Sequence, residues 1–229
     1  MRSIVLSFLS LICLACVCVP SLTHAALDDE YVTVPDVPRK GIHMKTLKQI
    51  EAYIHSIDTM KARFTQTAEV NREDLTGTFY LDRPGKLRFE YDDPIKNYIV
   101  SDGTFIYFYD DEMKSASQAL VGSTLAAFLV REDIELLDAS IEIMDLTRDK
   151  KKGLLGLTLR QADNPESGRL TLIFKEKPKL QLQKWLVVDS RGYVTQIELS
   201  DIKQGVSFDD EKDGLFTYVD SKITNPGYN

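Results

Sequence analysis

Cysteine is nearly absent from this chain of 229 residues. The only three cysteines, Cys13, Cys16 and Cys18, all lie close to the N-terminus. Without that segment, the protein cannot form a disulfide, bind a metal through thiolates or use a thiol as a nucleophile. None of the three has both the small preceding residue and the leucine at −3 that a lipid-attachment site requires, so we expect a product without a lipid anchor.

Histidine is also scarce, and no catalytic motif is recognisable. Beyond residue 25 there are only His43 and His55, in no metal-ligand spacing, and we interpret both as surface residues. The sequence has no G-x-S-x-G elbow and no phosphate-binding glycine loop. Residues 200–203 match S-x-x-K only by chance, because they end a strand pattern. We therefore expect no enzyme, no catalytic residue, no metal site and no cofactor.

Basic residues are in the minority. There are 28 Lys and Arg against 35 Asp and Glu, which gives a net charge of −7. Such an acidic chain is a poor candidate for binding nucleic acid or an anionic lipid surface, and we expect neither as a partner. Three acidic pairs are interpreted as turn residues, because neighbouring side chains on an extended chain point to opposite sides. These pairs are Asp92-Asp93, Asp110-Asp111 and Asp209-Asp210.

The longest apolar run stands at the N-terminus. It covers residues 4–19, follows the single charge of Arg2 and precedes Thr23-His24-Ala25. This is the pattern of a secretory signal peptide cleaved after Ala25, and the run is short for a membrane span. An uncleaved anchor is the alternative. The predicted division of the chain is 1–25 signal peptide, 26–43 extended leader and 44–229 a single domain.

Helical periodicity is confined to two places. The first is the stretch from Met44 to Ile57, where apolar residues recur at steps of three and four, which predicts an amphipathic helix of about four turns. The second is an insert at about 112–137. There Met113, Ala116 and Leu120 share one helical face, and Gly122-Ser123 offers Ser123 as the N-cap of a following apolar segment.

The rest of the chain has β patterns separated by Gly, Pro, Asp or Asn. About eleven antiparallel strands that are apolar on one face predict a strongly curved sheet or barrel, with the helices on its concave side. The expected strands are 60–70, 74–81, 86–91, 96–101, 104–109, 140–147, 154–161, 169–175, 183–189, 193–200 and 215–219.

The most distinctive block is 77–109, GTFYLDRPGKLRFEYDDPIKNYIVSDGTFIYFY. Its turn and strand RP-G-x-[LF]-R-[FW]-x-Y, and the hairpin V-S-D-G-x-x-[IL]-[YW]-x-Y, resemble those of the LolA family of periplasmic lipoprotein carriers. In pattern, the resemblance extends over about residues 44–224. It implies an α+β fold, namely a single incomplete antiparallel β-barrel with an N-terminal helix and a helical lid over an apolar cavity.

The resemblance also implies roles for individual residues. Pro84 restricts the backbone of Arg83, whose planar fork of donors suits binding carbonyls at helix ends. By resemblance, Arg83 is the latch that keeps the lid closed. The residues expected to line the cavity and bind acyl chains are apolar or aromatic, and they are Phe79, Leu87, Phe89, Tyr91, Phe105, Tyr107, Leu125, Phe128 and Leu129.

Finally, the resemblance implies partners. A monomeric carrier in the periplasm would receive acylated lipoproteins from an inner-membrane ATP-binding-cassette complex and deliver them to an outer-membrane receptor of the same fold. Three alternatives remain open at this point. They are a same-fold module that holds another lipid or senses lipoproteins, the membrane-anchored receptor itself, and a secreted hydrolase.

Overall fold

A computed structural model describes residues 44–69, 74–132, 134–211 and 214–219. The predicted signal peptide and leader, together with His43, lie outside the described residues. The predicted helix is present as α2 (Met44–His55), with Leu47, Ile50 and Ile54 buried along one face. Its apolar stripe explains why it packs on the sheet, since burial of that face stabilises a short helix that would be marginal alone.

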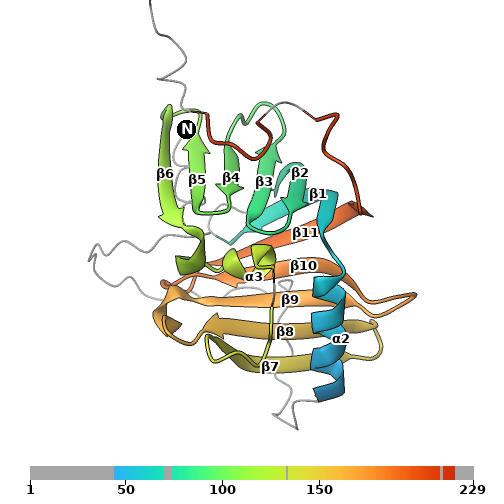
Figure 1. Cartoon of the computed structure of the whole chain (residues 1–229). Coiled ribbons are helices and arrows are strands. Elements are labelled where there is room, and N and C mark those ends of the chain that lie inside the picture. Colours follow the sequence, from blue (N-terminus) through green and yellow to red (C-terminus); the bar gives the residue numbers. More distant parts are fainter. Residues whose placement is uncertain (1–43, 70–73, 133, 212–213, 220–229) are drawn as a thin grey trace, which may run out of the picture.

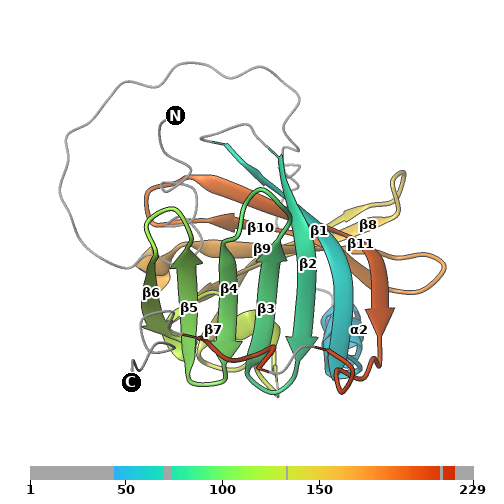
Figure 2. The same cartoon turned by 90° about the horizontal axis from the view of Figure 1, so that it is seen from above.

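Eleven strands form one antiparallel sheet, which confirms the predicted sheet architecture. The spatial order is β6-β5-β4-β3-β2-β1-β11-β10-β9-β8-β7, so the first and last strands of the chain, β1 and β11, pair in the middle. The edges β6 and β7 do not pair with each other, and the sheet stays open. Its two halves curve around α2 and the short helix α3 (Ala127–Val130), as Figures 1 and 2 show.

The bounds of the strands follow the predicted β patterns closely, with two exceptions described below. The strands are β1 (Thr59–Ala68), β2 (Asp74–Asp82), β3 (Lys86–Tyr91), β4 (Tyr98–Asp102), β5 (Phe105–Asp110), β6 (Ser115–Leu120), β7 (Ile141–Asp149), β8 (Leu154–Gln161), β9 (Arg169–Lys175), β10 (Gln181–Val188) and β11 (Val194–Gln204). Two 3-10 turns, η1 (Val121–Ser123) and η2 (Pro165–Ser167), complete the described elements.

The first half of the predicted helical insert is wrong. Residues Ser115–Leu120 are the edge strand β6, which pairs with β5 from Phe105↔Leu120 to Asp110↔Ser115. Ala116 and Leu120 are four residues apart, a spacing that both a helical face and one face of a strand allow. Pairing with β5 decides between the two. The expected helical face is not buried either, since Met113 and Leu120 are 58% and 56% exposed.

Two further expectations are corrected. Ser123 does not cap a helix, because its hydroxyl donates to the Leu120 carbonyl at 2.8 Å and α3 begins only at Ala127, without a side-chain cap. Residues 215–219 do not form a strand. They belong to an irregular segment, the strap (residues 207–211 and 214–219), which crosses the outer face of the sheet beside β3, β4 and β5 (Figures 1 and 2).

Candidate functional site

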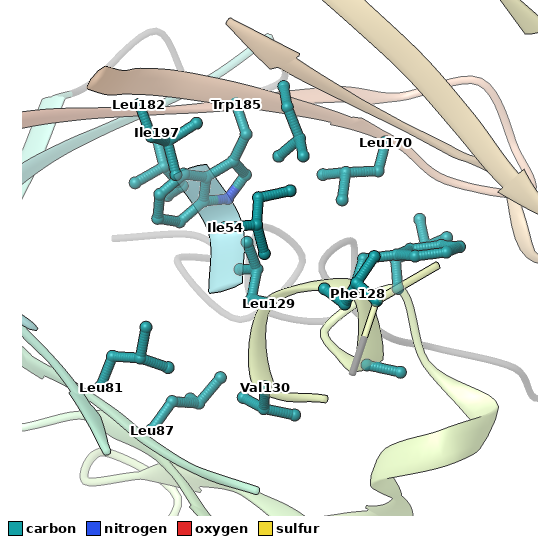
Figure 3. Close-up of a cluster of buried hydrophobic side chains, with 14 of the residues drawn as sticks. Ile54, Leu81, Leu87, Phe128, Leu129, Val130, Leu170, Leu182, Trp185 and Ile197 are labelled. Carbon is teal, nitrogen blue, oxygen red and sulfur yellow. The ribbon is translucent and has the colours of Figure 1, made fainter. Parts of the chain in front are cut away.

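The interior between the two halves of the sheet is occupied by the chain's own insert. We call residues 121–130, which comprise η1, α3 and the link between them, the plug. Phe128, Leu129 and Val130 of α3 are 2%, 9% and 1% exposed and lie between the two halves (Figure 3). Leu81 and Leu87 approach from one side, and side chains of β9, β10 and β11 from the other.

Seven of the nine predicted cavity residues lie in this buried cluster. They are Phe79, Leu87, Phe89, Tyr91, Leu125, Phe128 and Leu129. Their placement follows from the period-two alternation of β2 and β3, whose inner rows pair as Phe79↔Phe89 and Leu81↔Leu87. Phe79 and Phe89 also pack on Trp185 of β10, with ring centroids 5.7 and 6.2 Å away. The two halves therefore meet through aromatic contacts as well as through the plug.

Phe105 and Tyr107 are the two exceptions, and the expectation that they face the cavity is wrong. In β5 the inner row is Ile106, which is 1% exposed, and Phe108, which packs against the core. Phe105 and Tyr107 therefore point outward. The ring of Tyr107 stacks on Tyr218 of the strap, with centroids 4.8 Å apart and planes 9° apart. Because residues 105–109 are apolar or aromatic on both faces, the sequence pattern does not indicate which face of this strand points to the interior.

The expected open cavity is almost completely filled by side chains. Between the plug and the sheet, the described side chains leave small apolar voids, among them two of about 20 Å³ each. One is bounded by Phe79, Phe128 and Trp185, and the other by Leu87, Leu125 and Trp185, while Leu129 borders both. A void of this size holds no more than a single water. An acyl chain could enter only if the plug moved out.

Two helix C-termini converge on Arg83. Its Nε donates to the carbonyl of Leu129 in α3 at 2.8 Å, and its Nη1 donates to the carbonyl of Ile54 in α2 at 2.6 Å. The N–H of Gly85 donates to the carbonyl of Val130 at 2.8 Å. These are carbonyls at helix ends that lack partners within their helices, and they lie at the negative end of the helix dipole, which favours a cation.

Arg83 is largely removed from solvent, and this affects its charge. Burial lowers the pKa of Arg83 to about 10, while the neighbouring Tyr53 and Asp58 act in the opposite direction. The guanidinium is nevertheless protonated at neutral pH, because 10 is well above 7. A charged fork held at some desolvation cost forms stronger hydrogen bonds to the two carbonyls than a neutral donor would.

The segment that follows the plug is tied to α2. The N–H of Ile134 donates to Nε2 of His55 at 3.2 Å, and the N–H of Leu136 donates to a carboxylate oxygen of Glu51 at 2.7 Å. Ile134 and Leu136 are 1% and 0% exposed. His55 was interpreted from the sequence as a surface residue, and it is exposed. It also accepts a hydrogen bond from Ile134 and so helps to hold the segment after the plug against α2.

Trp185 is the main interior residue that the sequence did not single out. It is 2% exposed and borders both voids. The alternation of apolar and polar residues in β10 did not predict an inward Trp185, because a bulge between Leu182 and Lys184 interrupts it. After the bulge, Trp185 takes the inward direction that Leu182 has, although the two are three residues apart.

The strap covers the opposite face of the sheet. Arg88 is 6% exposed, with its guanidinium 4.4 Å from the ring of Tyr98 and Nη1 3.3 Å from the carbonyl of Leu215. Phe208 packs on Tyr80 at 6.1 Å. The outer face of β2–β5 is therefore a second packed layer that shares no side chains with the interior.

Within the described ranges, no group of His, Cys, Asp or Glu residues is arranged to bind a metal ion. Among the described helices, none is long and apolar enough to span a membrane. The fold and the buried site together define an open, curved antiparallel sheet of eleven strands with the plug packed against its inner face.

Comparison with known proteins identifies the family. Residues 55–218 match the family model of the outer membrane lipoprotein carrier protein LolA, and because this is well over half of the chain, the chain belongs to that family. The outer-membrane lipoprotein carrier protein of Methylococcus capsulatus is 31% identical over 170 residues, covering 70% of this chain and 78% of that protein. Its counterpart in Nitrosomonas europaea is 30% identical over 178 residues, covering 73% and 82%.

A solved structure shows a more distant likeness. The LolA superfamily protein NE2245 from Nitrosomonas europaea has a TM-score of 0.42 and 11% sequence identity, covering 78% of this chain and 99% of that chain.

Proposed function

We propose that this protein carries lipoproteins and that it binds their acyl chains in the space now filled by the plug. The observation that carries this proposal is the position of Phe128, Leu129 and Val130 between two apolar sheet faces. If the plug moves out, the same walls enclose a space lined by apolar side chains. Membership of a family of lipoprotein carriers supports this assignment.

The competition between plug and ligand explains why such a carrier would have a plug. Burial of an acyl chain is worth ~0.8 kcal/mol per CH₂, so exposing one long chain to water costs on the order of 10 kcal/mol. An empty apolar cavity of that capacity would promote aggregation. The side chains of Leu125, Phe128 and Leu129 fill it instead. The ligand must displace them on entry, and they expel the ligand on release.

In this proposal Arg83 is the latch of the closed form. Its two hydrogen bonds join the carbonyl of Leu129 in the plug to the carbonyl of Ile54 in α2. Each bond contributes ~1 kcal/mol net, and somewhat more when the donor is charged. Energies of this size set the fraction of closed molecules without preventing opening.

The remaining parts of the proposal concern compartment and partners. The chain is secreted across the inner membrane, its signal peptide is cleaved after Ala25, and it acts in the periplasm as a soluble monomer. Acylated lipoproteins are loaded by an inner-membrane ATP-binding-cassette complex and delivered to an outer-membrane receptor of the same fold. The intact mass of the processed protein checks this, because an acyl adduct would indicate an anchored receptor instead.

The ligand is tested by site-specific crosslinking. A photoreactive amino acid at position 87 should crosslink to an acylated lipoprotein, whereas the same amino acid at position 107 should not. Leu87 is buried on the inner face, whereas Tyr107 lies on the outer face against the strap, so the two positions report on opposite sides of the same sheet. Equal crosslinking at both positions, or crosslinking of the non-acylated protein, would contradict binding of acyl chains inside the barrel.

The carrier role is tested in cells. Depletion should leave lipoproteins of the outer membrane at the inner membrane, and mass spectrometry of the native protein should find acylated lipoproteins bound to it. A different lipid in the purified protein, together with normal lipoprotein sorting after depletion, would favour a lipid sensor of the same fold.

A further inference from the structure

Two hairpin turns bring a quarter of the basic charge of the chain to one place. The β7–β8 turn carries Lys150, Lys151 and Lys152, and the β9–β10 connection carries lysines at 177 and 179, next to the last residue of β9, Lys175. Residues 148–152 and 175–179 hold seven of the 28 basic residues of the chain. We call the six lysines of these two segments the lysine patch.

The two turns are adjacent in the fold. Leu154 pairs with Lys175, and the N–H of Glu176 donates to the carbonyl of Gly153 at 2.9 Å. Arg148 links the turns further through an ion pair with Glu176 at 3.0 Å. In both views the turns project from the same end of the sheet, beside α2 (Figures 1 and 2).

The lysine patch is concentrated positive charge on an acidic molecule. The two segments contain seven basic residues and two acidic ones, for a net charge of +5. Because the whole chain has a net charge of −7, the rest of the chain carries −12. All six lysines are exposed, and within the described part of the chain none of their ammonium groups forms an ion pair. Glu176 is paired with Arg148, and Asp149 accepts hydrogen bonds from the N–H groups of Lys151 and Lys152.

The neighbouring charges reinforce the lysine patch. Arg148 Nη2 lies 3.4 Å from the hydroxyl of Thr46 in the first turn of α2, which places Lys45 and Lys48, both exposed, near the same end of the molecule. Because charges are screened over roughly 8–10 Å at physiological salt, a surface that approaches this end experiences mainly the lysines and not the acidic remainder.

We propose that the lysine patch docks the protein on an anionic lipid surface. Cores of protein–protein interfaces are depleted in lysine and rely on aromatic residues and arginine as anchors. The patch offers flexible lysines separated by Gly153, Glu176 and Pro178, with no aromatic side chain, and it also lacks rings on which nucleic-acid bases could stack. Non-directional positive charge of this kind suits a layer of phosphate headgroups.

Docking in this way would keep the proposed latch away from the lipid surface. The lysine patch lies at the N-terminal end of α2, while Arg83 binds the carbonyl of Ile54 at the C-terminal end. A helix of 12 residues is roughly 18 Å long. The proposal does not depend on acyl-chain binding, and it revises the expectation from net charge that anionic lipid surfaces are excluded.

The test is co-sedimentation with vesicles. The protein is purified after expression of the full chain, with its N-terminus determined by mass, and mixed with phosphatidylcholine vesicles with or without phosphatidylglycerol. At about 50 mM salt it should bind only the anionic vesicles, and at about 0.5 M salt it should be released. Uptake of lipid into the barrel would be insensitive to salt, which separates it from docking.

Matched triple variants locate the site. Lys150→Gln, Lys151→Gln and Lys152→Gln together should lower partitioning on the order of 100-fold, because each lysine near an anionic surface contributes roughly a fivefold factor. The control removes the same charge from exposed lysines elsewhere, through Lys96→Gln, Lys114→Gln and Lys203→Gln, and should change partitioning much less.

Three outcomes would overturn the proposal. Equal losses in the two triple variants would show that only net charge matters. Equal binding of the wild type to neutral and anionic vesicles would leave the patch as a solvated surface or a site for an acidic protein. Release by inorganic phosphate at far lower ionic strength than by chloride would indicate a discrete phosphate site instead of a surface.

Discussion

Replacement of Arg83 by leucine is the most informative single perturbation of this molecule. Arg83→Leu removes both donors that join the end of α3 to the end of α2, while the adjacent hydrogen bond from Gly85 to Val130 is left in place. Because Leu is apolar and Arg83 borders one of the interior voids, we expect the substitution to be accommodated without unfolding the sheet.

The magnitude follows from the two hydrogen bonds. Two bonds from a cation contribute about 1–1.5 kcal/mol each, so their loss should destabilise the closed form by about 2–3 kcal/mol. These values per bond are at the low end for hydrogen bonds of charged groups. The low end applies because burial lowers the pKa of Arg83 to about 10, which shows that the buried cation has a desolvation cost. The expected shift toward open molecules is therefore about 30- to 150-fold.

The single tryptophan of the chain is a natural probe of this opening. Trp185 is 2% exposed and borders both voids next to Leu129. In Arg83→Leu, acrylamide should quench its fluorescence more strongly, and an apolar dye such as bis-ANS should bind more tightly. Arg83→Lys should be intermediate at best, because a single ammonium cannot replace the planar fork.

A matched control removes an arginine from the other face of the sheet. Arg63 of β1 pairs with Asp92 and contacts neither helix, so Arg63→Leu should leave quenching of Trp185 unchanged. If folded Arg83→Leu shows the same acrylamide quenching of Trp185 and the same dye binding as the wild type, Arg83 is only a turn residue and the latch is refuted. If both variants open equally, general destabilisation explains the effect.

Three further predictions address packing and charge. Leu87→Ala should lower the free energy of unfolding by about 2–5 kcal/mol in a urea titration, and a loss below about 1 kcal/mol would contradict its buried position. Leu215→Ala removes a side chain that is only 5% exposed, so it should speed amide exchange of strap residues 214–219 while β8 and β9 keep their protection, and uniform loss of protection would argue against a separately docked strap. Hydrogen bonds from Arg63 and Thr76 hold the pKa of Asp92 below its usual 3.8, so its contribution is complete above that pH and lost as pH falls through the lowered value. Asp92→Asn should therefore lower Tm at pH 7 and converge with the wild type in strong acid.

Much of this architecture was predictable from local pattern. Runs of β pattern between Gly, Pro, Asp and Asn residues placed most strands, and alternation is clearest in β1. In β3, alternation of apolar with charged residues oriented Leu87 and Phe89 toward the interior. The steps of three and four from Met44 predicted α2. The choice of Arg83 as the candidate latch came from the neighbouring Pro84 and from the family motif, both of which are visible in the sequence.

Other features could not be read locally, because more than one structure satisfies the same short-range pattern. Ala116 and Leu120 fit a helix or a strand until β5 offers its edge, and the run Phe105–Tyr109 fits either facing until Ile106 packs inside and Tyr107 meets Tyr218. Trp185 gained its inward direction only through the bulge in β10.

The amino-acid sequence by itself determined the acidity of the chain, its small number of histidines and the confinement of its cysteines to the first residues. None of these properties depends on a contact between side chains. Only the tertiary structure decided which charges lie together and which apolar side chains share one interior. Lys152 and Lys175 are distant in sequence, but antiparallel pairing of β8 with β9 makes their turns neighbours. In the same way, α2 and α3 meet at Arg83 because sheet curvature brings both helix ends to one turn, and no short-range pattern encodes that curvature.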